Sequence, residues 1–221
     1  MNCTCDYKQG NQKHMDHLNK NPSNGQSGND DVITNEYNPP LQRSINDIIS
    51  IDKEDESLQK YKEKLLGEAV HGKKIILDKT NMNFVLPKSL TLIVEDRPDR
   101  ELDLSGDLSK IKNDHVFIKE GAHYALKINF YVQREMVYGL KYVQTFSRKG
   151  IKVDKTVHMI GCYGPKNDLQ HYTTPIEEAP SGLLARGTYN VKSIFIDDDK
   201  REHLRWEWVL EIKKDWDECC G

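Results

Sequence analysis

"YALKINFYV", residues 124–132, gives the clearest indication of the fold, because apolar and polar side chains alternate along it with a period of two. The side chains of one parity are Tyr124, Leu126, Ile128, Phe130 and Val132. Such alternation is typical of a strand that buries one face and leaves the other in a more polar setting. The stretch therefore predicts a β-sheet with one covered face.

The same period continues on both sides of this stretch. It appears in 90–94 and 140–146, and further strand candidates are 101–104, 115–118, 156–160, 187–196 and 203–212. Turn-forming Gly, Pro, Asp and Asn residues separate them. About eight short strands with no helical pattern between them predict an all-β fold, an immunoglobulin-like antiparallel β-sandwich. The Cys…Trp…Cys spacing of antibody domains is absent, so the prediction concerns the architecture alone.

Two tryptophans lie in the last predicted strand, in "LRWEWVLEI", residues 204–212. Trp206 and Trp208 have the same parity, so both indoles project toward the interior. Tryptophans on an inner sandwich face usually fill the core. Two adjacent ones could instead line a slot for a ligand, and the spacing leaves both interpretations open.

Asp197, Asp198 and Asp199 stand between two strand candidates, where a solvated hairpin turn is the simplest interpretation. A calcium loop would need ligands at alternating positions, a central Gly and a late Glu, and "DDDKREHL" has none of that order. We therefore expect no metal site and no cofactor. The alternative to a plain turn is a carboxylate handle for a partner.

No catalytic motif is present. The chain has no Gly-x-Ser-x-Gly, no phosphate-binding Gly-rich loop and no His-Glu-x-x-His. A nucleophilic pair of Cys162 with His158 is conceivable, but a small buried thiol is the more common situation. The sequence predicts a binding protein and not an enzyme.

Residues 1–36 are rich in Asn, Gly, Gln, Ser, Lys and Asp and have almost no aliphatic side chains. Such a segment buries too little apolar surface to offset its ordering entropy, so we expect a disordered tail. Its cysteines and histidines do not have the spacing of a structural zinc site; they are Cys3, Cys5, His14 and His17.

Two short helices are predicted next. Ser44 is a candidate N-cap with Asp47 three residues later, and Ile45, Ile48 and Ile49 follow at helical spacing. The second helix has acids in its first turn, lysines in its last turn and Gly67 as its end. Its apolar stripe is Leu58, Tyr61 and Leu65. Neither helix is long enough to be stable alone, so each needs a surface, either on its own domain or on a partner.

Composition narrows the class of protein. The chain has 221 residues, of which 37% are hydrophobic and 30% are charged, with a net charge of -3. The negative charge argues against a surface that binds nucleic acid. No apolar run has the length of a signal peptide or a membrane span, so we expect a cytoplasmic protein with reduced cysteines.

Several motifs, taken in order, resemble the Rho GDP-dissociation inhibitor family from about Tyr37 to Trp216. They are "YNPPLQRSINDIISIDKEDESLQKYKEKLLG", "LDLSGDL", "FIKEGAHYALKINFYVQREMVYGLKYVQ", "RKGIKVDKT", "MIGCYGP", "TPIEEAPSGLLARGTY" and "FIDDDKREHLRWEWVLEIKKDW". The resemblance implies a sandwich that shelters the geranylgeranyl chain of a Rho-family GTPase between its sheets. It also implies a helical arm that covers the GTPase switch regions and blocks GDP release.

The resemblance carries the following residue assignments. The GTPase-binding candidates are Tyr37, Ser44, Ile45, Ile48, Asp55, Asp198 and Asp199. The prenyl-binding candidates are Leu65, Leu66, Leu92, Tyr124, Met136, Val191, Trp206, Trp208 and Leu210. The implied organisation is a disordered tail at 1–36, a GTPase-binding arm at 37–70, a prenyl-binding sandwich at 71–216 and a C-terminal tail at 217–221.

The implied partners are prenylated Rho-family GTPases, mainly GDP-bound, held by a monomer in a 1:1 complex with only indirect membrane contact. Two alternatives are a general prenyl-protein carrier of related sandwich fold without control of nucleotide exchange, and a plain immunoglobulin-like interaction module. Neither needs the arm motif at 37–67. Two departures from the family pattern are Cys162 at a position that is typically Ser and Met136 at one that is usually Ile, a swap of similar volume.

Overall fold

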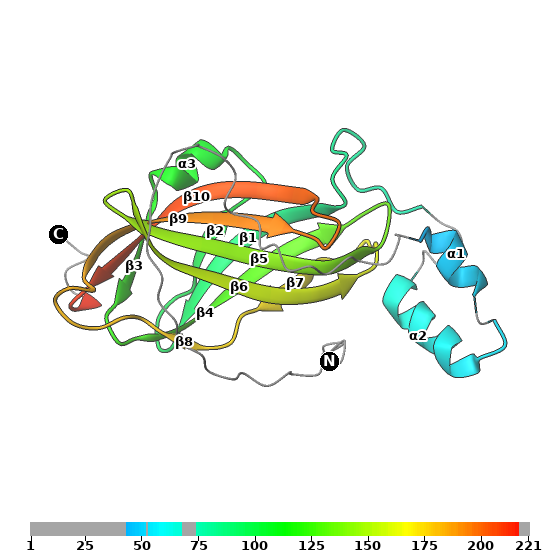
Figure 1. Cartoon of the computed structure of the whole chain (residues 1–221), viewed down its shortest axis with the longest axis horizontal. Coiled ribbons are helices and arrows are strands. Elements are labelled where there is room, and N and C mark those ends of the chain that lie inside the picture. Colours follow the sequence, from blue (N-terminus) through cyan, green and yellow to red (C-terminus); the bar gives the residue numbers. More distant parts are fainter. Residues whose placement is uncertain (1–42, 52, 68–73, 217–221) are drawn as a thin grey trace, which may run out of the picture. The chain divides into compact units, whose positions relative to one another are not determined.

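The computed structural model describes residues 43–51, 53–67 and 74–216 (Figure 1). The predicted tails at 1–36 and 217–221 lie outside these residues. Helices α1, Ile45–Ser50, and α2, Glu56–Leu66, come first along the described chain. A short helix α3, Leu108–Lys112, interrupts the strands that follow.

Both predicted arm helices are confirmed, and so is the predicted cap at Ser44, whereas Asp55, expected among the acids of the first turn, is the N-cap of α2. The Ser44 hydroxyl accepts a hydrogen bond from the Asp47 N–H at 3.2 Å, and the Asp47 carboxylate accepts one from the Ser44 N–H at 3.3 Å. The Asp55 carboxylate accepts from the N–H groups of Ser57 and Leu58 at the start of α2. These contacts satisfy N–H groups that have no partner within the helix.

Two sheets face each other in the rest of the molecule (Figure 1). The first has the order β2-β1-β4-β7, with β8 also paired to β4. Its strands are β1 (Val85–Val94), β2 (Arg100–Asp103), β4 (His123–Val132), β7 (Gln170–Thr173) and β8 (Glu177–Glu178). The second sheet has the order β3-β10-β9-β5-β6. Its strands are β3 (His115–Lys119), β5 (Val137–Arg148), β6 (Ile151–Tyr163), β9 (Gly187–Ile196) and β10 (Glu202–Lys213).

The sandwich differs from the prediction in two details. β3 pairs with β10 in parallel, although the sequence predicted an antiparallel arrangement throughout. The chain leaves β2 in the first sheet, passes through α3 and enters the second sheet in the direction of β10. The short elements β7, β8 and α3 were not predicted, because two to five residues are too few to show a period.

The sandwich core lies between the sheets and contains twenty-three buried apolar residues of the described chain. Phe130 of β4 is fully buried, with its ring edge-on to Phe195 of β9 at 5.5 Å and to Tyr163 of β6 at 5.0 Å. These contacts join the two sheets through aromatic packing. The alternating residues of 124–132 therefore face the second sheet, as their period predicted.

A second apolar cluster, which we call the arm cluster, joins the helices to the sandwich. Its buried members are Leu66, Ile75 and Met136, and its partly buried members are Ile45, Ile48, Ile49, Leu65 and Tyr138. The predicted stripe of α2 is only partly used, because Leu58 and Tyr61 are exposed. The side chains of α2 that are buried are Lys62, whose ammonium donates to the carbonyl of Ile51, and Leu66.

Candidate GTPase and prenyl sites

The three consecutive aspartates of the β9–β10 turn have three different environments. Asp197 is buried, and its Oδ2 lies 2.9 Å from His203 Nε2. His203 Nδ1 lies 3.4 Å from the backbone N of Val85 and accepts its N–H, so the imidazole donates to Asp197 through Nε2. Asp197 thus ties the turn to β1 of the opposite sheet and is not available to a partner.

Asp198 also has an internal partner. Its Oδ1 lies 2.6 Å from Lys141 Nζ, and its backbone N–H donates to the Tyr138 carbonyl at 3.1 Å. The close approach requires a glycine beside it: Gly139 has φ +55, and a Cβ there would lie 1.8 Å from Asp198 Oδ2. Asp198 is therefore a half-buried carboxylate held against β5.

Asp199 is the exposed member of the three. Within the described part of the chain, its carboxylate makes no hydrogen bond or ion pair. Its two neighbours fix the turn on which it stands. Of the three carboxylates, Asp199 is the one placed to meet a cation from outside.

Tyr138 connects this acidic turn to the arm. Its side chain packs on the arm cluster, while its carbonyl accepts the Asp198 N–H. Burial raises the pKa of the Tyr138 phenol, and the charges of Arg43 and Asp199 also act on it. The arm helices and the acidic turn therefore belong to one face of the molecule.

The other GTPase-binding candidates occupy the arm. Ser44 and Asp55 are exposed helix caps, and Ile45 and Ile48 are partly buried in the arm cluster. The Ile45 N–H also points to Glu135 Oε2, 3.5 Å away. Tyr37 lies outside the described residues.

The C-terminal end of α2 is seated on the turn after β6. Lys166 Nζ donates to the Lys64 carbonyl at 3.2 Å. A Cβ at Gly164 would lie 2.5 Å from the Leu65 carbonyl oxygen and 3.3 Å from Met136 Sδ. Only a residue without a side chain leaves room for this contact, so Gly164 helps to place Leu65 and Leu66.

The prenyl-binding candidates fall into two groups. Six belong to the sandwich core or pack against it: Leu92, Tyr124, Val191, Trp206, Trp208 and Leu210. Three belong to the arm cluster: Leu65, Leu66 and Met136. The structure thus brings the candidates together at two places, one between the sheets and one beneath the arm.

Both tryptophans fill the interior in this structure. Trp206 stacks on Tyr142 at 5.7 Å with 9° between the ring planes, and Trp208 Nε1 donates to Ser193 Oγ at 3.0 Å. The Tyr142 hydroxyl lies 3.1 Å from the same Ser193 oxygen. The inward direction predicted for the indoles is confirmed, and the space beside them is occupied by the protein's own side chains.

Two buried N–H groups in this part of the core lack partners. Gln144, Ser193 and Trp206 lie in one row across β5, β9 and β10. Gln144 Nε2 and Trp206 Nε1 are buried, and neither has a hydrogen-bond acceptor among the described residues. Unsatisfied buried donors cost free energy, so the packing around the tryptophans is less favourable than a fully paired core.

A polar contact joins the sheets at the edge formed by β6 and β8. His158 Nε2 lies 3.7 Å from Glu177 Oε1, and the Tyr124 hydroxyl donates to Glu177 Oε2 at 2.9 Å. Burial lowers the pKa of His158 and raises that of Tyr124, while Glu177 raises both. His158 also stacks on Tyr142, so this edge contacts the row that contains Trp206.

The structure supplies little for metal or nucleophile chemistry. Among residues 43–51, 53–67 and 74–216, no cluster of three or more His, Cys, Asp and Glu side chains could hold a metal ion. The cysteines and histidines of the tail lie outside this part. Cys162 forms no disulfide with a described residue and lies on β6, four residues and therefore about 13 Å along the strand from His158. This spacing argues against a Cys–His pair. No helix in the described residues is long and apolar enough to span a bilayer.

Sequence reasoning did not identify Tyr138, Lys141, His203 or the two glycines as parts of the site. Lys141 and His203 matter because strand register brings them to the aspartates, which the local pattern does not show. Gly139 gave a usable signal, since a glycine within a strand pattern often marks a bulge or a close approach. The register of β5 is indeed irregular between Val137 and Lys141.

Comparison with known proteins shows one family. A family model described as "RHO protein GDP dissociation inhibitor" matches residues 22–215. Human Rho GDP-dissociation inhibitor 1 is 50% identical over 181 residues, which cover 81% of this chain and 86% of that protein. Bovine Rho GDP-dissociation inhibitor 3 is 43% identical over 188 residues, covering 85% and 81%.

More distant proteins also match. A probable rho GDP-dissociation inhibitor of Caenorhabditis elegans is 41% identical over 181 residues, covering 81% of this chain and 93% of that protein. Among solved structures, a Niemann-Pick type C2 protein from the Japanese carpenter ant has a TM-score of 0.39 and 12% identity. It covers 58% of this chain and 93% of its own. A TM-score this low has no bearing on function.

Proposed function

This chain belongs to the RHO protein GDP dissociation inhibitor family, and from that membership we propose that it binds prenylated Rho-family GTPases, mainly GDP-bound, one per monomer in the cytoplasm. It blocks GDP release through the arm and extracts the GTPase from membranes by sheltering the geranylgeranyl chain. One observation supports this proposal. Tyr138 packs on the arm cluster through its side chain and holds the acidic turn, with its exposed Asp199, through its carbonyl.

The arm acts on nucleotide exchange. A segment that packs across the switch loops raises the cost of opening the nucleotide site, so GDP is retained. The exposed Leu58 and Tyr61 of α2 offer apolar surface for this contact. Ile45 and Ile48 now pack on the arm cluster, so a GTPase that used them would replace part of an internal contact with an external one.

The prenyl chain enters between the sheets. Because the tryptophans fill that space in the structure, uptake requires the sheets to part or the side chains of the row to turn. The N–H groups of Gln144 and Trp206 have no acceptor among the described residues, so moving these side chains breaks no hydrogen bond of those two groups. Leu65, Leu66 and Met136 would then line the entrance below the arm.

Magnitudes decide which contact drives extraction. Burial from water stabilises an apolar chain by about 0.8 kcal/mol per CH2, but the prenyl chain leaves a bilayer that is already apolar. The net transfer free energy is therefore small. The driving contribution must come from contacts that the membrane cannot supply, namely those of the arm and of Asp199.

A truncation tests this division of labour. A chain that begins after residue 66 keeps the sandwich and loses both arm helices. We expect it to bind a prenylated peptide and to fail to strip a prenylated Rho-family GTPase from vesicles. Extraction equal to that of the full chain would contradict the proposal.

Asp199 is tested by charge reversal. Asp199→Arg should weaken the complex with the GTPase by about 2 kcal/mol or more, as expected for a like-charge contact at an interface. Asp99→Arg is the matched control, because Asp99 is another exposed acid in a turn. Titration calorimetry with the GDP-bound GTPase measures both, and equal affinities of the two variants would remove Asp199 from the site.

The isoleucines of α1 are tested in the same assay. Ile45→Asp with Ile48→Asp should abolish inhibition of GDP release, measured with a fluorescent GDP analogue. The control is Asn46→Asp, an exposed position of the same helix. Inhibition that survives in the double variant would mean that α1 does not contact the switch regions.

A further inference from the structure

Two turns at the end of the sandwich remote from the acidic turn expose large apolar side chains. β5 begins beside Asp198 and ends at Arg148, and β9 begins at Gly187 and runs toward Asp197, so both turns lie at the far end of these strands. In the β5–β6 hairpin, Ile151 is 70% exposed and Val153 51%. In the turn before β9, Leu183 is 79% exposed and Leu184 89%.

Arg148 joins the two turns. Its guanidinium donates to the carbonyl of Leu184 and, at 2.6 Å, to that of Arg186. Arg148 is also the ladder partner of Ile151. Ile151 and the turn of Leu183 and Leu184, which we call the leucine turn, therefore flank the same guanidinium. We call the following six residues the hairpin-end surface: Lys149, Ile151, Lys152, Val153, Leu183 and Leu184.

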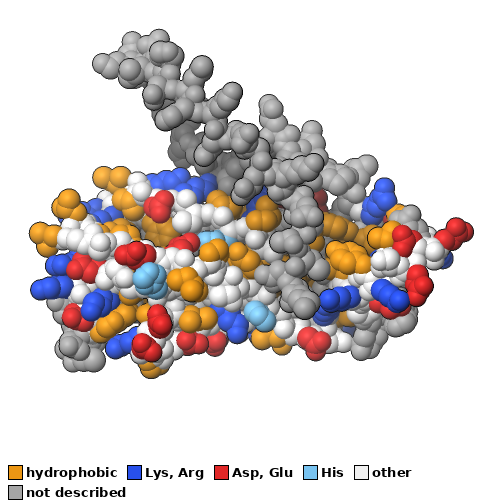
Figure 2. Space-filling model, turned by 90° about the horizontal axis from the view of Figure 1, so that it is seen from below, with side chains coloured by type: hydrophobic (Ala, Val, Ile, Leu, Met, Phe, Trp, Pro, Cys, Tyr) orange, Lys and Arg blue, Asp and Glu red, His pale blue; other side chains and the backbone are white. Residues whose placement is uncertain are grey.

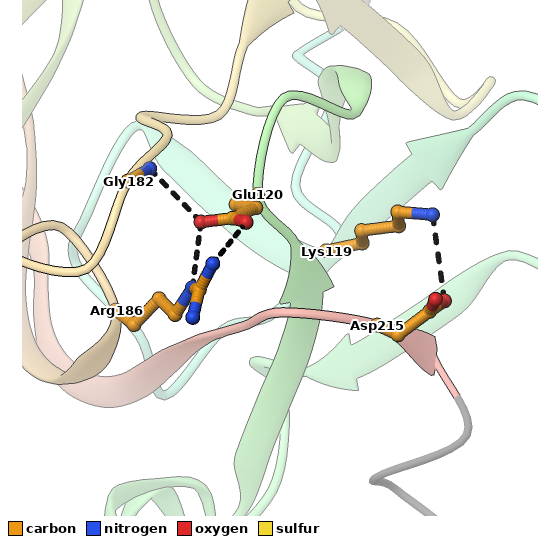
Figure 3. Close-up of polar contacts among 5 residues, drawn as sticks. All are labelled: Lys119, Glu120, Gly182, Arg186 and Asp215. Carbon is orange, nitrogen blue, oxygen red and sulfur yellow. Dashed lines mark hydrogen bonds and ion pairs between the residues drawn. The ribbon is translucent and has the colours of Figure 1, made fainter.

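The leucine turn is held in place from its other side by Glu120 (Figure 3). The Glu120 carboxylate accepts from the Gly182 N–H at 2.9 Å and from Arg186 Nε and Nη2 at 2.8 and 2.6 Å. These hydrogen bonds, above all those from Arg186, lower the pKa of Glu120 to about 2, so it remains charged at physiological pH. The two leucines are thus exposed on a turn whose conformation is held by hydrogen bonds.

The charge of the β5–β6 hairpin contrasts with that of the whole chain. Residues 147–155, "SRKGIKVDK", contain four basic residues and one acid, a local charge of +3 in a chain whose net charge is -3. Lys149 and Gly150 both have positive φ, as in a tight two-residue hairpin turn, which places Lys149 at the tip. Figure 2 keeps this end on the left and shows hydrophobic and basic side chains side by side there, with acidic ones among them.

We propose that the hairpin-end surface binds the anionic face of a lipid bilayer. Apolar side chains that enter the headgroup region, together with lysines that meet acidic headgroups, are the combination by which peripheral proteins hold such a surface. Two neighbouring turns suit a bilayer, which needs no shape complementarity. The sequence predicted only indirect contact with a membrane, whereas the hairpin-end surface would bind the bilayer directly and without a GTPase.

Vesicle co-sedimentation of the full chain, without any GTPase, tests the inference. The probes are vesicles of phosphatidylcholine mixed with phosphatidylserine and vesicles of phosphatidylcholine alone. We expect binding to the anionic vesicles that weakens as salt is added. Leu183→Ser with Leu184→Ser, and separately Lys149→Glu with Lys152→Glu, should each weaken binding by about tenfold or more.

The matched control is Lys79→Glu with Met82→Ser. It removes one exposed cation and one apolar side chain that is 71% exposed, on the loop that contacts His203 at the acidic end. The control should bind anionic vesicles as the parent chain does. Equal losses in the control and the hairpin-end variants would overturn the inference, and so would a parent chain that binds neither vesicle or binds both equally.

The same variants also test whether something other than a bilayer occupies this surface. Self-association that the leucine variant abolishes in sedimentation velocity would identify a second copy of this chain. A loss of affinity for an unprenylated GTPase in vesicle-free solution would identify a protein contact. Either result, without a loss of vesicle binding, overturns the inference. Failure to inhibit GDP release would count against the proposed function alone.

Discussion

The sandwich core and the arm cluster are both apolar, but they differ greatly in size. The core contains twenty-three buried residues of the described chain between two hydrogen-bonded sheets, whereas the arm cluster contains three. A large core unfolds cooperatively, while a small cluster can open locally at low cost. We therefore expect Ile45 and Ile48 to leave their internal contacts at low cost, as the proposed function requires, and Phe130 to stay in place.

This comparison gives the proposed mechanism its energy scale. If the arm leaves the cluster to bind a GTPase, the affinity reflects the difference between two similar apolar contacts. A mutation in the core should therefore act on folding, and a mutation in the arm cluster should act on the docking of α1 and α2. The largest effects on stability should come from substitutions in the core.

Phe130→Ala should lower the free energy of unfolding by about 3 to 5 kcal/mol, because it leaves a cavity between the two sheets. Urea denaturation followed by tryptophan fluorescence measures the change. Met82→Ala, at an exposed position, is the control and should stay within about 0.5 kcal/mol. A loss below about 1 kcal/mol for Phe130→Ala would mean that the core is not one cooperative unit.

His203→Ala should cost about 2 to 3 kcal/mol, because it leaves the buried Asp197 carboxylate without its imidazole donor. His203 lies at the acidic turn, but its hydrogen bonds tie that turn to the sandwich, so its loss should act on folding. Glu202→Gln breaks an exposed ion pair with Arg205 on the same strand and should cost less than about 1 kcal/mol. Equal effects of the two changes in urea denaturation would contradict the structural role of the pair.

Leu66→Ala should change the global free energy of unfolding by less than about 1 kcal/mol, although Leu66 is fully buried, because the arm can undock while the sandwich stays folded. The visible effect should be faster hydrogen exchange of the backbone amides in 45–66. Leu58→Ala, at an exposed position of α2, should leave that exchange unchanged. A global loss as large as that of Phe130→Ala would merge the two clusters into one unit.

The smallest expected effect is a dependence of stability on pH through His158. Burial lowers its pKa in the folded protein, so the unfolded chain binds the proton more readily. Stability should be constant at neutral pH and above, and should fall as the pH drops below the ordinary histidine pKa of about 6.5. It should stop falling, for this residue, below the lowered pKa of the folded protein.

His158→Gln should reduce this loss, and His171→Gln, on the exposed side of β7, should retain it. The measurement is the urea midpoint on both sides of the ordinary histidine pKa. A parent chain and a His158→Gln variant with the same loss on acidification would show that the β6–β8 edge does not sense pH.

Local features of the structure could be predicted because they depend on residues close in the chain. The cap at Ser44 requires only a polar side chain three residues from an N–H group. The cap at Asp55 is equally local, although the sequence placed this residue among the acids of the first turn. The strand at 124–132 follows from a period of two. By contrast, the buried face of α2 was misjudged: Leu58 and Tyr61 form the better apolar stripe, yet Leu66 and Lys62 are buried. The surface that a helix meets decides which side it covers.

Residues close together in the chain were enough to predict a β-sandwich with a helical arm, two inward tryptophans and three acids in one turn. The role of each acid could be read only from the folded protein. Asp197 meets His203, Asp198 meets Lys141 and Asp199 faces solvent, because strand register and a bend at Gly139 bring those partners to the turn. Alternation and capping act over a few residues, whereas Lys141 is 57 residues from Asp198 and reaches it only through strand pairing. His203 is six residues from Asp197, but its ring is oriented by the backbone N–H of Val85 on the opposite sheet.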